Sequence, residues 1–189
     1  MKRKNFAVFI SGYGRGAIEI INNHRNQLIK PELKLILSSN PHAHCLVHAS
    51  ANKIRCAVVE RQHHLSKKSF ETQILSILHE YEIDYIYLAG WLHILGTTLL
   101  NAFAGRIVNV HPSLLPAFKG LNAINQAMDY GVKITGVTTH YVDETLDGGK
   151  IIAQKSIEID RGESFDQIDK RLFSVTADLT KETINQIFI

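Results

Sequence analysis

The chain has 189 residues, of which 45% are hydrophobic and 21% are charged, and its formal net charge at pH 7 is +3. This length favours one domain over residues 1–189, and the small charge suits an anionic ligand but not a nucleic-acid partner. Two cysteines are too few for a disulfide framework, and no run reaches the roughly 18 apolar residues of a membrane span, so we expect a cytoplasmic protein without a membrane partner.

Short apolar runs alternate with amphipathic segments through the first part of the chain. Apolar runs of strand length occupy residues 6–10, 33–37, 56–59, 85–89 and 107–110. Helical patterns follow the Gly-rich turn at 12–16 as far as residue 24 and recur at 42–52, 66–81 and 97–104. Short continuous strands separated by helices are typical of an α/β fold, in which helices cover both faces of a mostly parallel sheet.

The pattern changes after Pro116. We expect a helix at residues 123–130, a half-exposed strand at 135–142 with its partner at 151–159, and a final helix at 164–187. Strict alternation of polar and apolar residues is the basis for the half-exposed strand. Ser164 stands three residues before Gln167, which is the spacing of a helix capping box.

Three polar or Gly-rich features fall where predicted strands end. They are the loop at residues 12–16, the stretch at 90–93, and the pair Asn109 and His111. Ligands of doubly wound sheets bind outside the carboxyl ends of the strands. We therefore expect these three features to surround one site.

The loop at residues 12–17 (GYGRGA) lies between a strand and a helix. This context suits a phosphate held by backbone N–H groups at a helix N-terminus, and Arg15 would add charge. A tight turn that needs glycine for its dihedral angles is the alternative. A dinucleotide site would also require an acidic residue about 20 positions on. Residues 38–40 (SSN) supply none, which disfavours NAD.

Asn109 and His111 are two residues apart on a strand, so their side chains should project from the same face. Asp147 precedes two glycines, in a turn where the backbone can approach closely. An amide and a protonated imidazole aimed at one point would stabilise an oxyanion, and a carboxylate would orient the ring and sustain its charge. In the alternative interpretation, the amide satisfies backbone groups at the strand end and the histidine is a core residue.

The ten histidines do not indicate a metal site. His44 and His48 have helical spacing and Cys45 follows the first of them, but no second Cys/His pair stands at zinc-finger spacing. The H-E-x-x-H pattern of zinc proteases is also absent from the sequence. We expect no metal.

Residues 109–116 (NVHPSLLP) and 135–149 (TGVTTHYVDETLDGG) resemble the folate-dependent formyltransferases, and the similarity extends from about residue 6 to about residue 154. The resemblance implies a Rossmann-like domain with the formyltransferase fold. It implies direct transfer of a formyl group from 10-formyltetrahydrofolate to the amine of glycinamide ribonucleotide in purine biosynthesis. Neither a metal nor a covalent enzyme intermediate takes part in that reaction.

The resemblance also assigns site residues. The catalytic residues would be Asn109, His111 and Asp147. The loop around the phosphate of the substrate would consist of Ser11, Gly12, Gly14, Arg15 and Gly16. The folate would be bound by Lys67, Leu92, His93, Ile94, Leu95, Asp143, Glu144, Thr145 and Leu146. The expected partners are thus an anionic ribonucleotide amine and a reduced folate, bound by a monomer or a homodimer.

Three departures from the family pattern concern the acceptor side and the edge of the pocket. The phosphate loop usually reads S-G-x-G-S-N, whereas residues 11–16 read SGYGRG. His93 stands where an arginine is common, and residues 176–181 lack the glutamate of the usual E-H-x-x-Y-P motif. A related transferase for another phosphorylated or nucleotide-linked amine, such as an amino sugar, is therefore an alternative. A hydrolase that releases formate, a non-catalytic binding protein and a nicotinamide oxidoreductase also remain open.

Overall fold

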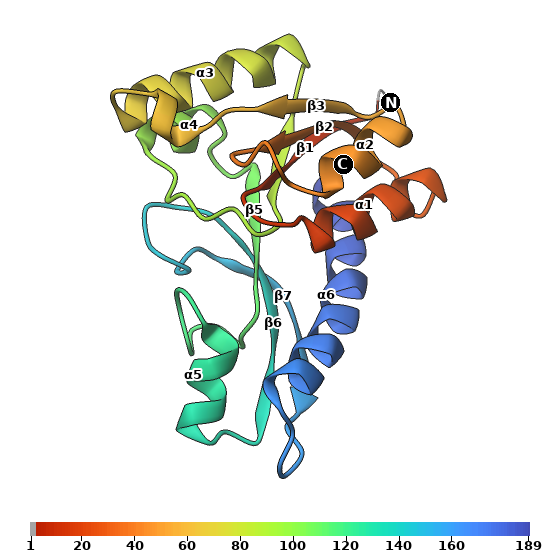
Figure 1. Cartoon of the computed structure of the whole chain (residues 1–189), viewed down its shortest axis with the longest axis vertical. Helices are drawn as coiled ribbons and strands as arrows, with labels where there is room; N and C mark the ends of the chain where they lie inside the picture. The colour runs from red at the N-terminus through yellow and green to blue at the C-terminus, as the bar shows by residue number, and fades with distance from the viewer. Residues whose placement is uncertain (1–2) are drawn as a thin grey trace.

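The computed structural model describes residues 3–189 and shows one sheet with the strand order β3-β2-β1-β4-β5-β6-β7 (Figure 1). The strands are β1 (Asn5–Ile10), β2 (Glu32–Ser38), β3 (Arg55–Val58), β4 (Tyr85–Leu88), β5 (Ile107–His111), β6 (Ile134–Tyr141) and β7 (Ile151–Glu158). The helices are α1 (Arg15–Arg25), α2 (Cys45–Ala51), α3 (Lys67–Glu80), α4 (Thr97–Ala102), α5 (Ala123–Tyr130) and α6 (Phe165–Ile187), and η1 (Arg61–His63) is a 3-10 turn.

The sheet is parallel from β3 to β5 and antiparallel from β5 to β7. This arrangement confirms the predicted mostly parallel sheet and the predicted pairing of the last two strands. Each predicted strand agrees with an observed one to within one residue at both ends. The agreement follows from the short continuous apolar runs, which are typical of strands buried on both faces.

Two apolar layers cover the sheet because side chains alternate along each strand. Phe6, Val8 and Ile10 pack with α1, α2 and α6 on one face. Ala7 and Phe9 pack with α3 and α4 on the other. Figure 1 shows α1, α2 and α6 together on one side of the sheet, with α3 and α4 opposite. The predicted coverage of both faces is thereby confirmed.

Helix α6 is attached to the sheet by hydroxyl pairs as well as by apolar contacts. The hydroxyl groups of Tyr87 and Thr180 lie 2.8 Å apart, and those of Thr139 and Thr183 lie 2.9 Å apart. The capping box predicted at Ser164 is present. These contacts fix the helix across the ends of β4 and β6, and this placement forms one wall of the cavity described below.

Two predictions need correction. Helix α2 begins at Cys45 and not at residue 42, because Pro41 and the bond from the His42 amide to Asn40 Oδ1 form a turn there. Strand β6 was predicted to be half-exposed, but it is buried along nearly its whole length. Helix α6 covers one of its faces, and the loop that follows β5 covers the other. No helix within residues 3–189 is long and apolar enough to cross a membrane.

Candidate active site

The end of β5 presents Asn109 and His111 on one face of the strand. Antiparallel pairing with β6 places Asn109 opposite His140 and His111 opposite Thr138. Val110 points to the other face, where it packs against the core beneath α1 and α6. The predicted projection of the two polar side chains from one strand end is therefore observed.

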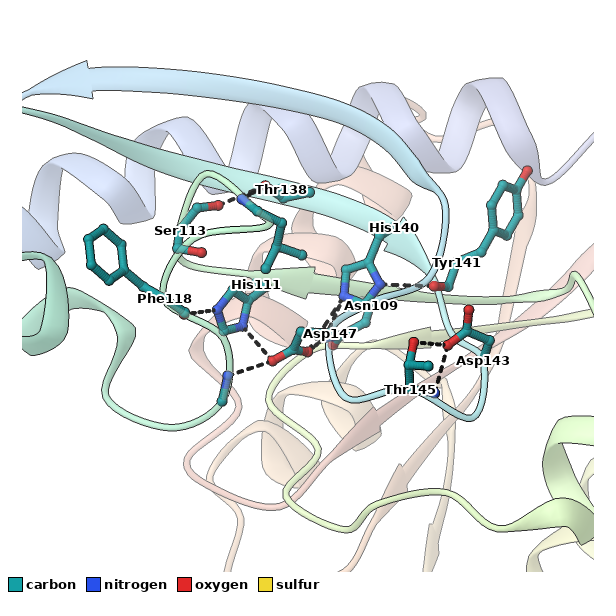
Figure 2. Close-up of polar contacts among 12 residues, drawn as sticks. Asn109, His111, Ser113, Phe118, Thr138, His140, Tyr141, Asp143, Thr145 and Asp147 are labelled. Atoms are coloured by element: carbon teal, nitrogen blue, oxygen red, sulfur yellow. Dashed lines mark hydrogen bonds and ion pairs between the residues drawn. The ribbon is translucent and has the colours of Figure 1, made fainter.

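Asp147 lies between these side chains, as Figure 2 shows. Its Oδ2 accepts a 2.8 Å hydrogen bond from the Gly120 amide and lies 3.4 Å from His111 Nδ1. Its Oδ1 lies 3.5 Å from Asn109 Nδ2. The backbone of Asp147 is left-handed, with φ of 44°, a conformation that aspartate tolerates better than most residues. Amide, imidazole and carboxylate thus meet, although they come from two distant segments.

His140 is a member of this cluster that our sequence analysis missed. Burial lowers the pKa of His140 from its usual value of 6.5, so the ring is neutral near pH 7. Its Nδ1 donates to the Tyr141 carbonyl at 2.9 Å, which leaves Nε2 to accept from Asn109 Nδ2 at 3.2 Å. The pairing of β5 with β6 could have identified it, because this pairing sets His140 directly across from Asn109.

Both ring nitrogens of His111 face acceptors. Nε2 donates to the Phe118 carbonyl at 2.8 Å, while Nδ1 faces the carboxylate of Asp147. A ring with a proton on each nitrogen would donate to both acceptors. Asn109 and His111 both face the carboxylate of Asp147, and whether they also aim at a substrate oxyanion stays a prediction. To donate a hydrogen bond to a substrate, Nε2 of His111 would have to give up its bond to the Phe118 carbonyl.

Buried hydrogen bonds hold the loop after β5 in place. Thr138 Oγ1 donates to the Ser113 carbonyl at 2.7 Å and accepts from the Leu115 amide at 3.1 Å. The Gln154 side chain donates to the Leu115 carbonyl and to Thr138 Oγ1, both at 2.9 Å. The peptide bond between Leu115 and Pro116 is cis. The loop is therefore anchored directly beside His111.

The Gly-rich loop leads into α1 through a left-handed residue, Gly14, with φ of 85°. A side chain at this position would collide with Cys45, so the backbone here requires glycine. Arg15 forms a bidentate pair with Asp169 of α6, at 2.7 and 2.9 Å, and lies 4.3 Å from the centroid of the Phe173 ring. Ser11 Oγ accepts from the Leu92 amide at 3.0 Å, which joins the loops after β1 and β4.

A cavity of about 220 Å³ adjoins this loop. Its walls come from α1, from the ends of β4 and β5, and from α6, and include Arg15, Pro112, Asp169, Phe173 and Thr176. Pro112 follows His111 directly, so the cavity reaches the strand end that carries the catalytic candidates. A larger cavity of about 720 Å³ is lined by the end of α1, the segment from there to the start of β2, and Arg3, Asn52 and Ile54, and none of the predicted site residues lines it.

The predicted folate residues after β4 divide between surface and core. Leu92 and Ile94 are exposed, whereas Leu95 is buried among the residues that pack against α3 and α4. Burial and the nearby charge of Arg61 lower the pKa of His93. Its ring packs edge-on against Phe70 and Trp91.

Two residues of α3 lie against the end of this loop at Gly96. Lys67, the first residue of α3, lies against Gly96, where a Cβ atom would meet its side chain. Glu71 is buried and accepts a 2.5 Å hydrogen bond from the Gly96 amide. Glu71 was not among the predicted residues. Its position inside an amphipathic helix pattern gave no signal that it holds a loop.

The remaining predicted folate residues form a turn before Asp147. Asp143 accepts hydrogen bonds from the amide and the hydroxyl of Thr145, which lower the pKa of the carboxyl. Glu144 and Leu146 are exposed. Within residues 3–189, no group of three or more His, Cys, Asp or Glu side chains is arranged to hold a metal ion.

Comparisons with known proteins identify the family and agree with the fold. Residues 4–184 match the family described as formyl transferase. The chain is 39% identical over 184 residues to the phosphoribosylglycinamide formyltransferase of Bacillus subtilis (strain 168), covering 97% of this chain and 94% of that protein. The crystal structure of glycinamide ribonucleotide transformylase 1 from Geobacillus kaustophilus is similar with a TM-score of 0.96 and 37% identity over 100% of both chains. Identity to the trifunctional purine biosynthetic protein adenosine-3 of Homo sapiens is 33%, over 90% of this chain and 17% of that protein.

Proposed function

The chain belongs to the formyl transferase family, and we propose that it transfers the formyl group of 10-formyltetrahydrofolate to the amine of glycinamide ribonucleotide in purine biosynthesis. The observation that carries this proposal is the meeting of Asn109, His111 and Asp147 at the end of β5. Relatives that share most of the length of this chain are named for the same reaction. The reaction needs no nucleophilic Ser or Cys.

In the proposed mechanism, the amine of the acceptor attacks the formyl carbon and the carbonyl oxygen becomes an oxyanion. Donors from the Asn109 amide and from protonated His111 stabilise this charge, and loss of one such donor typically costs about 100- to 1000-fold in rate. The intermediate collapses by breaking the bond between the formyl carbon and N10 of the folate. Asp147 accepts the proton that the amine loses, through a water, and N10 takes up a proton from His111.

His140 and Asp147 keep the Asn109 amide in position for this step. The neutral ring of His140 accepts one of the two amide hydrogens at 3.2 Å. The other hydrogen faces Asp147 at 3.5 Å, which is a long and weak contact. An oxyanion on this side of the amide could therefore replace Asp147 as the acceptor of the second hydrogen at little cost, while the first one stays bonded to His140.

The folate would lie over the loops after β4 and before Asp147. Leu92, Ile94 and Leu146 are large apolar side chains exposed near these loops, and they suit the flat ring of a reduced folate. The acceptor would enter from the cavity beside Arg15 on the other side of β5.

A second acceptor deserves a test because the acceptor side departs from the family. Thr176 stands where the resemblance places a glutamate, and its hydroxyl donates to the Leu172 carbonyl at 2.7 Å. Arg15 and Phe173 supply a cation and an aromatic face in the same cavity. An amine carried by another phosphorylated or nucleotide-linked compound is the second candidate.

The test is a steady-state assay of the purified chain with 10-formyltetrahydrofolate and glycinamide ribonucleotide, followed by the absorbance of the folate product. We expect turnover that depends on both substrates and falls sharply in His111→Ala. Turnover of an amino-sugar nucleotide without turnover of glycinamide ribonucleotide would replace the proposed acceptor with the second candidate. Formate release without any acceptor would indicate a hydrolase, and inactivity with all acceptors would contradict the proposal.

A further inference from the structure

The guanidinium of Arg15 is already occupied by a carboxylate of this chain. Both of its terminal nitrogens donate to Asp169, at 2.7 and 2.9 Å, in the parallel geometry that arginine also adopts with phosphate. Asp169 is the main cause of the raised pKa of Arg15. Within the described part of the chain, these two residues are the one cation and the one anion among the lining residues of the cavity. Their charges cancel.

The pair is nevertheless accessible. The side chain of Arg15 is 54% exposed and that of Asp169 is 26% exposed, so water can solvate the carboxylate when it is released. The ring of Phe173 holds the guanidinium at 4.3 Å independently of the carboxylate. A cation that rests on an aromatic face keeps its place when its ionic partner changes. The arrangement therefore allows exchange of one anion for another.

We propose that Asp169 is a specificity-determining residue, a built-in competitor that holds Arg15 until a dianionic phosphate of the acceptor displaces its carboxylate. This inference rests on the proposed function, because it assigns the cavity to the acceptor.

The charge of the incoming group decides whether exchange is favourable. A monoanion that replaces Asp169 restores one negative charge and loses a partner that was already tethered in place. A phosphate monoester carries about −1.5 to −2 charges at pH 7 and three acceptor oxygens. It therefore attracts Arg15 more strongly than the carboxylate it displaces, whereas a monoanion does not. A neutral amine leaves the ion pair intact and gains nothing. Phosphodiesters and carboxylates, which are singly charged, should therefore bind weakly.

The test measures binding of inorganic phosphate and of acetate by calorimetry near pH 8, without any turnover. We expect wild-type protein to bind phosphate and to show no measurable binding of acetate. Asp169→Asn should tighten phosphate about fivefold, the size expected for release of a partly exposed ion pair, and should make acetate binding measurable. The KM for glycinamide ribonucleotide should fall by the same factor as the dissociation constant of phosphate.

A double-mutant cycle isolates the competition from a general change of charge. Arg15→Gln should weaken phosphate binding, and adding Asp169→Asn to Arg15→Gln should give no improvement. Asp178→Asn is the matched control, because it removes one negative charge from the exposed surface of the same helix without contacting Arg15. It should leave phosphate binding within about twofold of wild type, since salt screens distant surface charges.

Unchanged or weaker phosphate binding in Asp169→Asn would overturn the inference, as would an improvement that persists without Arg15. Asp169→Ala keeps the helix propensity and provides a second variant should Asp169→Asn fail to fold. If glycinamide ribonucleotide is not formylated but phosphate responds as expected, the proposed acceptor fails and the inference stands. If glycinamide ribonucleotide is formylated and phosphate binding is indifferent to Asp169, only the inference fails.

Discussion

The proposed reacting centre and the proposed acceptor cavity lie on opposite faces of β5 and are constructed differently. In the centre, backbone groups hold the polar side chains: the Gly120 amide binds Asp147, the Phe118 carbonyl binds His111, and the Tyr141 carbonyl binds His140. In the cavity, Arg15 and Asp169 hold each other by side chains alone, across two helices.

Two of the three departures from the family pattern, at the loop of residues 11–16 and at Thr176, lie at the cavity and not in the centre. When a polar side chain of the centre is replaced, the buried backbone group bonded to it loses its hydrogen-bond partner. A pair of side chains on two helices can be exchanged together while both helices keep their backbone bonds. We therefore expect changes in the centre to reduce kcat strongly, and changes in the cavity to shift KM modestly.

The largest effect is expected for His111→Ala. Loss of the ring removes a donor to the oxyanion, and kcat should fall about 100- to 1000-fold with little change in the KM of either substrate. Single-turnover formyl transfer measures the chemical step directly. His79→Ala, a change of the same type on α3 outside the site, is the control. A loss below about tenfold would mean that the donor on His111 is not used.

A smaller effect is expected for His140→Ala. The variant removes the acceptor that holds the Asn109 amide, and a hydrogen bond of this kind contributes about 1 kcal/mol, so kcat should fall about fivefold to tenfold. His140→Gln, which offers an oxygen at the end of its side chain, should recover most of this loss. Equal activity of the two variants would argue against a positioning role.

The same residue predicts a pH dependence. The pKa of His140 is lowered in the folded protein by burial, whereas the unfolded chain takes up its proton near the usual value of about 6.5. The unfolded state therefore binds more protons as the pH falls, and the free energy of unfolding should decrease from about pH 6.5 downward. Denaturant unfolding between pH 7 and pH 5 measures this loss, and His140→Gln should reduce the slope. An equal slope in both proteins would place the loss at another group.

The sequence predicted the reacting centre better than the cavity for physical reasons. Asn109 and His111 are local on a strand, where alternation alone sets the common face, and strand pairing would also have identified His140. The contact of Arg15 with Asp169 joins positions 154 residues apart and depends on how α6 crosses the sheet. An aspartate on an amphipathic helix is typical of a solvated face, so the local sequence did not indicate that Asp169 contacts Arg15.

The burial of β6 was predicted wrongly for a related reason. Its alternating threonines indicate one solvated face, but Thr138 and Thr139 are both buried and satisfied by partners on opposite faces of the sheet. Thr138 bonds to the loop after β5, and Thr139 bonds to Thr183 of α6. Alternation along a strand shows only which side chains are polar. A buried threonine with a hydrogen-bond partner therefore cannot be distinguished from an exposed one by this pattern.

Glu71→Ala tests whether a side chain of α3 holds the loop after β4, which we propose binds the folate, as firmly as backbone groups hold the centre. The change leaves the partly buried Gly96 amide without its acceptor, which should cost about 1 to 3 kcal/mol. For a chain of this size, the midpoint of thermal unfolding should fall by about 2 to 10 °C. The KM for the folate should rise while the KM for the acceptor stays constant. Glu71→Gln retains an acceptor oxygen and should lie close to wild type. An unchanged folate KM in Glu71→Ala would limit the residue to a role in stability.

The smallest expected effect is that of Phe173→Leu, which keeps an apolar side chain but removes the aromatic face beneath Arg15. A partly exposed cation–π contact contributes about 0.5 to 1 kcal/mol, so the KM for the acceptor should rise about twofold to fivefold with kcat unchanged. Phe173→Tyr keeps the face and should stay near wild type. The two variants together separate the ring from the bulk of the side chain. If Phe173→Leu lowered kcat instead of raising KM, the cavity would contribute to the chemical step, and the division between a backbone-held centre and a side-chain-held cavity would fail.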